Sequence, residues 1–156
     1  MKSILFVCLG NICRSPMAEG AFLHLINEKG LAADFYVDSA GTAGYHVGER
    51  PDKRMIQTAE KHGVYLPSRA RKFVKEDFER FDFIVVMDES NLHDVLRLKN
   101  DTAKATVLKM REFDDIGRGG DVPDPYYGGM NGFEEVYEML MRCNDNFIEY
   151  LKNKNE

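Results

Sequence analysis

The sequence predicts one α/β domain with a three-layer α/β/α fold, in which helices cover both faces of a four-stranded parallel sheet. Short apolar segments rich in branched and aromatic residues alternate along the chain with stretches of helical periodicity, and this alternation is typical of a parallel sheet. The segment FDFIVVM (residues 81–87) is apolar almost throughout, as expected of a strand buried on both faces. The length of 156 residues, 44% of them hydrophobic, suits a single domain over residues 1–156.

The individual elements follow from apolar spacing and from helix-ending residues. The first helix runs from Pro16 to Lys29, because its apolar residues recur at helical spacing, Pro16 suits a first helical position and Gly30 suits a helix exit. The predicted strands are residues 3–9, 35–42, 81–87 and 105–110, and the other predicted helices are residues 52–62, 89–98 and 133–152. Residues 111–132 hold most of the turn-forming residues and are predicted to be a loop.

Composition and charge exclude several classes of protein. A net charge of -5 gives no support to nucleic-acid binding, which usually needs a basic face. No apolar run is long enough to cross a bilayer, and no signal peptide is recognisable. Three cysteines are too few for a disulfide scaffold and favour a reducing, cytoplasmic location. We expect a monomer that binds neither nucleic acid nor membrane.

The motif VCLGNICRS (residues 7–15) lies where the first strand ends and the first helix begins. In a parallel sheet this is the edge at which ligands bind. A loop of this kind can point successive backbone N–H groups inward and form an anion-binding nest, to which the helix dipole adds. Gly10 permits close approach of a ligand to the backbone, and Asn11 tolerates left-handed geometry. Arg14 adds a planar guanidinium that matches two oxygens of an oxyanion.

Cys8 would lie in the positive electrostatic field of the backbone N–H groups, the helix dipole and Arg14, and it is expected to be a thiolate nucleophile. A thiolate beneath an oxyanion site indicates attack on phosphorus and a phosphocysteine intermediate, with no metal and no cofactor. A zinc site is the first alternative, but the two loop cysteines supply only half of one, and neither Cys143 nor the histidines have ligand spacing. A merely buried cysteine is the second alternative, and it leaves Arg14, Ser15 and Pro16 unexplained.

A phosphatase also needs a general acid that protonates the leaving oxygen. The segment DPYYGG (residues 124–129) offers Asp124, in the loop that follows the last strand. Asp-Pro is common turn chemistry, so this residue gains weight only together with Cys8. Tyr126 and Tyr127 would then form an aromatic wall beside the site.

The chain resembles the low-molecular-weight protein tyrosine phosphatases in four motifs: VCLGNICRS, VDSAGT, VVMDESNL and DPYYGG. The resemblance covers nearly the whole chain. It implies that Cys8 is the nucleophile, that Arg14 binds phosphate, that Asp124 acts as acid and then base, and that Ser15 helps the sulfur to leave. Tyrosine-phosphorylated proteins would be the substrates, and inorganic phosphate or a similar oxyanion would bind the loop.

The resemblance also assigns residues around this centre. The phosphate-binding loop would comprise Leu9, Gly10, Asn11, Ile12, Cys13 and Arg14. Hydrogen bonds of Asn11 and Ser39 would support the loop. The substrate mouth would be lined by Leu9, Ile12, Tyr45 and Tyr127, together with Tyr126 of the aromatic wall.

Cys13 and Ser68 carry two further expectations from the resemblance. Cys13 matches the second loop cysteine of relatives, which forms a reversible disulfide with the nucleophile; the alternative is that Cys13 only packs under the loop. Ser68 stands three residues before Arg71, where many members carry a histidine that supports the loop. Here Ser68, water or another group must supply that support.

Several other functions share parts of this pattern. Arsenate reductases need further cysteines in a central segment, and residues 14–142 contain none. Protein-arginine phosphatases tend to have threonine at the position of Ile12. A cysteine phosphocarrier of sugar transport needs neither Asp124 nor an aromatic mouth, and a phosphotyrosine-binding module would not need the full catalytic set. We therefore predict hydrolysis of phosphotyrosine and small aryl phosphates, with the phosphocarrier and the protein-arginine phosphatase as alternatives.

Overall fold

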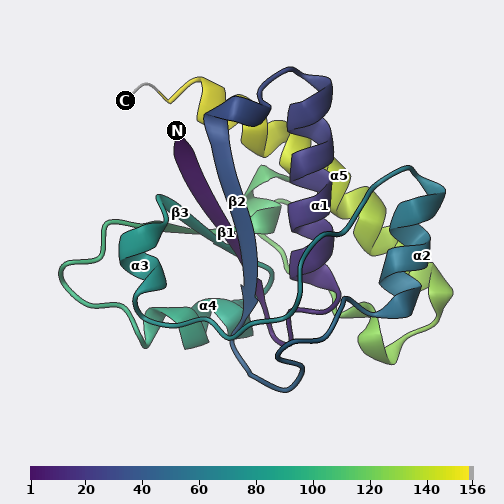
Figure 1. Ribbon diagram of the computed structural model, residues 1–156, viewed down its shortest axis with the longest axis horizontal. Helices are drawn as coiled ribbons and strands as arrows, with labels where there is room; N and C mark the ends of the chain where they lie inside the picture. The colour runs from purple at the N-terminus through teal and green to yellow at the C-terminus, as the bar shows by residue number, and fades with distance from the viewer. Residues whose placement is uncertain (155–156) are drawn as a thin grey trace.

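The computed structural model describes residues 1–154 and contains, within them, one sheet of four parallel strands with helices on both faces (Figure 1). The strands are β1 (Lys2–Cys8), β2 (Phe35–Gly41), β3 (Phe83–Val86) and β4 (Thr106–Lys109), in the spatial order β2-β1-β3-β4. The helices are α1 (Arg14–Glu28), α2 (Lys53–Lys61), α3 (Asp77–Arg80), α4 (Glu89–Leu96) and α5 (Met130–Lys152), with 3₁₀ turns η1 (Ala32–Asp34), η2 (Met110–Phe113) and η3 (Pro125–Tyr127). The predicted three-layer fold around a parallel sheet is confirmed.

Each face of the sheet carries its own apolar core. Figure 1 shows α1 and α5 on one side of the sheet and α3 and α4 on the other. On the first side, Phe6 of β1 packs against Phe22 of α1 and Phe147 of α5, with ring centroids 5.8 and 6.4 Å away. On the second side, Phe78 of α3 and Val95 of α4 are completely buried against β1 and β3. Within residues 1–154, no helix combines the length and the hydrophobicity that a membrane crossing requires.

Some element boundaries differ from the prediction. Helix α1 begins at Arg14, so Pro16 lies inside the first turn, where a missing backbone N–H costs no intrahelical hydrogen bond. Gly30 follows the helix with a φ of 72°, as its predicted exit role requires. Helix α5 begins at Met130, before the predicted start at Phe133. The four-residue helix α3 was not predicted, because it is too short to show periodicity.

The sheet brings the carboxyl ends of its strands, including Cys8, to one edge. All strand pairs are parallel, so their carboxyl ends meet there. Cys8 is the last residue of β1, Gly41 is the last of β2, and Asp88 lies two residues beyond β3. The backbone N–H of Thr42 donates to the carbonyl of Cys8 at 2.8 Å. The β1–α1 loop therefore starts from a strand that is held on both sides.

Candidate active site

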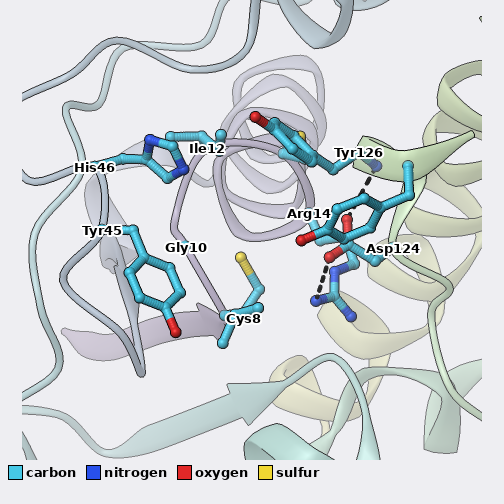
Figure 2. Close-up of a pocket in the computed structure, with 11 residues that line it drawn as sticks. Cys8, Gly10, Ile12, Arg14, Tyr45, His46, Asp124 and Tyr126 are labelled. Carbon is cyan, nitrogen blue, oxygen red and sulfur yellow. Dashed lines mark hydrogen bonds and ion pairs between the residues drawn. The ribbon is translucent and has the colours of Figure 1, made fainter.

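The loop between β1 and α1 lines the base of a pocket, and Cys8 lies at its start (Figure 2). Asn11 has a φ of 59°, the only positive value among non-glycine residues in the described chain. This agrees with the left-handed geometry expected of it. Cys8, Asn11, Ser15 and Arg14 are all at least 97% buried, so these residues belong to the protein interior, whereas Leu9 and Gly10 are partly exposed.

The Cys8 sulfur lies 3.0 Å from the Ser15 hydroxyl oxygen. Asn11 Nδ2 donates to that same oxygen at 2.8 Å, while the backbone N–H of Arg71 donates to Asn11 Oδ1 at 3.0 Å. These bonds fix the orientation of the Asn11 amide, because its oxygen must face the Arg71 N–H. Ser15 Oγ accepts from Asn11, so its own proton can point to the Cys8 sulfur or to the carbonyl of Ala40, which lies 3.4 Å away.

A polar network continues beneath the loop to a buried carboxyl group. Asn11 Nδ2 also donates to Ser39 Oγ at 3.0 Å, and Ser39 Oγ donates to Glu19 Oε1 at 2.7 Å. Ser68 Oγ lies 3.5 Å from Ser39 Oγ, which is long for a hydroxyl hydrogen bond. The closest partner of Ser39 in the network is therefore Glu19. Sequence reasoning missed Glu19, because a glutamate within a helix usually lies on the solvated face.

Glu19 is only 5% exposed. Burial raises the pKa of its carboxyl group to about 7, and the hydrogen bond from Ser39 partly opposes this. Near neutral pH the group is thus close to its titration point, directly below the phosphate loop.

The Arg14 guanidinium is held by two carboxylates and a carbonyl. Its Nη1 donates to Asp88 Oδ2 at 2.6 Å and to the carbonyl of Val122 at 3.0 Å, and its Nη2 lies 3.5 Å from Asp124 Oδ2. Burial lowers the pKa of Arg14, but the negative groups Cys8, Asp88 and Asp124 outweigh burial and raise it. Asp88 was not predicted; its place just after a buried strand, at the ligand-binding edge, was the signal that could have found it.

Asp124 serves both its local turn and the pocket. Its Oδ1 accepts from the backbone N–H of Tyr126 at 3.0 Å and so caps the short turn η3, while its Oδ2 faces Arg14. Its side chain is 29% exposed, and it lines the same pocket as Cys8. The nearby Asp121 instead pairs with Lys109 at 2.8 Å. The structure thus separates Asp124 from its acidic neighbours.

The rim of the pocket is aromatic. Figure 2 shows Tyr45 and His46 on one side of the Cys8 sulfur and Tyr126 and Asp124 on the other. The His46 ring lies 6.5 Å from the ring of Tyr45 and 6.3 Å from that of Tyr126. His46 was not predicted. The pocket is lined by Cys8, Leu9, Gly10, Ile12, Cys13, Arg14, Tyr45, His46, Asp124, Tyr126 and Tyr127.

These lining residues include every predicted mouth residue, and the two predicted support residues, Asn11 and Ser39, lie in the network below. A pocket with aromatic residues at its rim and the Arg14 guanidinium at its base suits an aryl group that carries an anion. Within residues 1–154, no three histidine, cysteine, aspartate or glutamate side chains are grouped so that they could hold a metal ion.

Comparison with known proteins identifies the family. A model of the low molecular weight phosphotyrosine protein phosphatases matches residues 3–156. The low molecular weight phosphotyrosine protein phosphatase of Schizosaccharomyces pombe is 44% identical over 147 residues, which cover 94% of each chain. The resemblance stated from the motifs is therefore confirmed over almost the full length.

Solved structures agree with this assignment. A protein tyrosine phosphatase from Entamoeba histolytica, crystallised with Hepes in its active site, superposes with a TM-score of 0.93 at 39% identity and 97% coverage of both chains. A Drosophila arginine phosphatase superposes with a TM-score of 0.92 at 33% identity, over 99% of this chain and 100% of that one. The chain belongs to the low molecular weight phosphotyrosine protein phosphatase family and is a protein tyrosine phosphatase.

Proposed function

We propose that the protein hydrolyses phosphotyrosine in proteins, and small aryl phosphates, through a phosphocysteine intermediate on Cys8. The observation that carries the proposal is the convergence of the Cys8 sulfur, the Arg14 guanidinium and the Asp124 carboxyl group on one aromatic-rimmed pocket. Arg14 and the backbone N–H groups of residues 9–14 neutralise the transferring phosphoryl group, so the reaction needs no metal and no cofactor.

The first step transfers the phosphoryl group to the enzyme. The Cys8 thiolate attacks phosphorus, the bond between phosphorus and the phenolic oxygen breaks, and Asp124 gives its proton to that oxygen. Tyrosine leaves and Cys8 carries the phosphate. The tyrosines of the rim and the side chains of Leu9 and Ile12 hold the ring of the substrate.

The second step returns the enzyme to its starting state. Asp124 now takes a proton from a water molecule, which attacks phosphorus and breaks the sulfur–phosphorus bond. Ser15 donates a hydrogen bond to the departing sulfur, supported by its 3.0 Å approach to Cys8. Asn11 and Ser39 hold the loop in its anion-binding shape throughout.

We further propose that Cys13 protects the nucleophile by forming a reversible disulfide with Cys8 after oxidation. Cys13 is buried beside Cys8 in the pocket lining. The whole chain would act as one domain and as a monomer, on tyrosine-phosphorylated proteins of the cytoplasm.

Dephosphorylation of arginine is a second candidate, since a structural relative is an arginine phosphatase. Ile12 at the mouth favours an aryl group over that substrate. A cysteine phosphocarrier is disfavoured by Asp124 and the aromatic rim, because a stable phosphocysteine needs neither.

The decisive experiment measures phosphate release from matched phosphotyrosine, phosphoserine and phosphoarginine peptides in the presence of a chelator. We expect release from the phosphotyrosine peptide only. Release from phosphoarginine alone would favour the second candidate. Absence of release, with stable phosphate on Cys8 seen by intact mass, would favour the phosphocarrier.

A further inference from the structure

Arg54, in the first turn of α2, connects the phosphate loop to the loop that carries Asp124. Its side chain is 38% exposed, and its guanidinium spans two segments that lie 72 residues apart in sequence. None of the catalytic steps above uses it. Its contacts nevertheless run from one half of the pocket to the other.

At one end, Arg54 is fixed through Asp52. Its Nε and Nη2 donate to the two oxygens of Asp52 at 3.1 and 2.9 Å, a fork-shaped pairing that sets the plane of the guanidinium. Asp52 in turn caps α2 by accepting from the backbone N–H of Arg54 at 2.8 Å. The backbone N–H of Asp52 donates to the carbonyl of Ile12 at 2.8 Å. Arg54 is therefore oriented by a residue bonded directly to the phosphate loop.

At the other end, Arg54 holds Tyr126. Its Nη2 donates to the carbonyl of Tyr126 at 3.3 Å, and its guanidinium carbon lies 5.5 Å from the centroid of the Tyr126 ring. The same carbon lies 4.7 Å from the ring centroid of Phe133, in the first turn of α5. Both ring contacts are within the range of cation–π attraction.

Tyr126 is also the residue that holds Asp124, because its backbone N–H donates to Asp124 Oδ1 at 3.0 Å. A continuous series of contacts thus runs from Ile12 through Asp52, Arg54 and Tyr126 to Asp124. This series lets the position of the carboxyl group follow the position of the phosphate loop.

We propose that Arg54 is a positioning residue for the general acid: it anchors Tyr126, and through Tyr126 the carboxyl group of Asp124, to the phosphate loop. The proposal rests on the role proposed for Asp124 above. Arg54 itself touches no reacting atom. Its loss displaces the acid relative to the leaving oxygen, and displacement of a catalytic group by about 1 Å is enough to slow a reaction on the order of a hundredfold.

The test compares kcat/KM for a series of aryl phosphates whose leaving phenols range from basic to acidic. The variants are Arg54→Ala, Arg54→Lys, Asp124→Ala and the double variant Arg54→Ala/Asp124→Ala. Poor leaving groups need the proton from the acid, whereas para-nitrophenol leaves with little help. We expect Arg54→Ala to lower kcat/KM for phenyl phosphate roughly tenfold to a hundredfold, and to lower it much less for para-nitrophenyl phosphate. Arg54→Lys keeps the charge without the fork, and an intermediate loss is expected.

The double variant separates positioning from a general structural role. If Arg54 acts through Asp124, adding Arg54→Ala to Asp124→Ala causes little further loss. The inhibition constant of inorganic phosphate stays unchanged, because the phosphate loop is intact. Lys53→Ala, a change of the exposed neighbour on the same helix, is the matched control and should behave as wild type.

Two results would overturn the proposal. Equal losses for all leaving groups, or losses that multiply in the double variant, would show that Arg54 does not act through Asp124. If kcat/KM of the single variant Asp124→Ala depended on the leaving group in the same way as that of the wild type, Asp124 would instead be excluded as the acid. That outcome defeats the catalytic assignment itself, and it is distinguishable because it is visible without any change at Arg54.

Discussion

The bottom of the pocket, called its base here and formed by the loop of residues 8–15, and its rim, formed by Tyr45, His46, Tyr126 and Tyr127, are built in opposite ways. In the base, Asn11 is 1% and Ser15 0% exposed, whereas Tyr45 and Tyr127 on the rim are 74% and 83% exposed. The base is joined by hydrogen bonds of 2.8 to 3.0 Å that lead into the sheet. Tyr45 and Tyr127 come from two separate segments and are largely exposed to solvent, whereas Tyr126 is 39% exposed.

This difference matches the demands on each half. Stabilising the charge of a transferring phosphoryl group requires dipoles that are already in place before the reaction. A protein substrate, in contrast, needs an open entrance that it can reach. Changes in the base should therefore affect chemistry and stability together, whereas changes at the rim should affect substrate use with little effect on folding.

Replacement of Cys8 by serine in the base is expected to have the largest effect. If Cys8 is the nucleophile, as proposed, its loss should lower kcat on the order of 10⁶-fold, as removal of a nucleophile does in serine proteases. Hydrolysis of para-nitrophenyl phosphate measures this, and calorimetry should still detect phosphate binding. Cys143→Ala, at a buried cysteine outside the pocket, should retain activity. More than a trace of turnover in Cys8→Ser would exclude Cys8 as the nucleophile.

Peroxide should react differently with Cys8 and Cys13, the two thiols at the base of the pocket. Peroxide oxidises the Cys8 thiolate to a sulfenic acid and is reduced to water; the Cys13 thiol then displaces a second water and forms the disulfide. Burial raises the pKa of Cys13, which makes this thiol a poor first target for peroxide, so we expect Cys13 to act as the resolving thiol. We expect complete inactivation that a reductant reverses in wild type but not in Cys13→Ser. Intact mass showing only sulfinic acid in wild type would end the protective role.

Glu19 should make the stability of the base depend on pH. Burial raises the pKa of its carboxyl group from 4.5 to about 7, so the folded state binds this proton more tightly than the unfolded state. The stability that this provides is fully present below pH 4.5 and is lost as pH rises through about 7; the shift corresponds to ~3 kcal/mol.

The matched variant is Glu19→Gln, which cannot titrate but can still accept from Ser39. Urea unfolding of both proteins at a series of pH values measures the free energy of unfolding. We expect the wild type to lose stability relative to Glu19→Gln across this interval. Parallel profiles would mean that Glu19 titrates normally and that the base lacks this pH dependence.

Tyr127→Ala at the rim should have the smallest effect. Because the side chain is 83% exposed, the free energy of unfolding should change by less than about 0.5 kcal/mol. Loss of an aromatic contact with the substrate should lower kcat/KM for a phosphotyrosine peptide by about threefold to tenfold. Tyr65→Ala, at a tyrosine that is 72% exposed and outside the pocket, should change neither quantity. If Tyr127→Ala destabilised the protein as much as variants at the base of the pocket do, the contrast between the base and the rim would not hold.

The phosphate loop could be predicted because its parts are contiguous. Cys8, Asn11, Arg14 and Ser15 lie within one strand–loop–helix unit, and the physical requirement for each is local: a strand end, a left-handed φ, a helix N-terminus. The parallel sheet could be predicted from alternation for the same reason. Asp124 needed the resemblance as well, since an Asp-Pro turn alone has many uses.

Other features depend on contacts between distant segments and were not predictable. Asp88 reaches Arg14 only because β1 and β3 are neighbours in the sheet. Glu19 is buried only because α1 packs over the β2 residue Ser39, and Arg54 joins loops that are far apart in sequence. Each is a common surface residue type with no unusual local pattern. Burial and pairing distinguish such residues, and these properties arise only when the chain is folded.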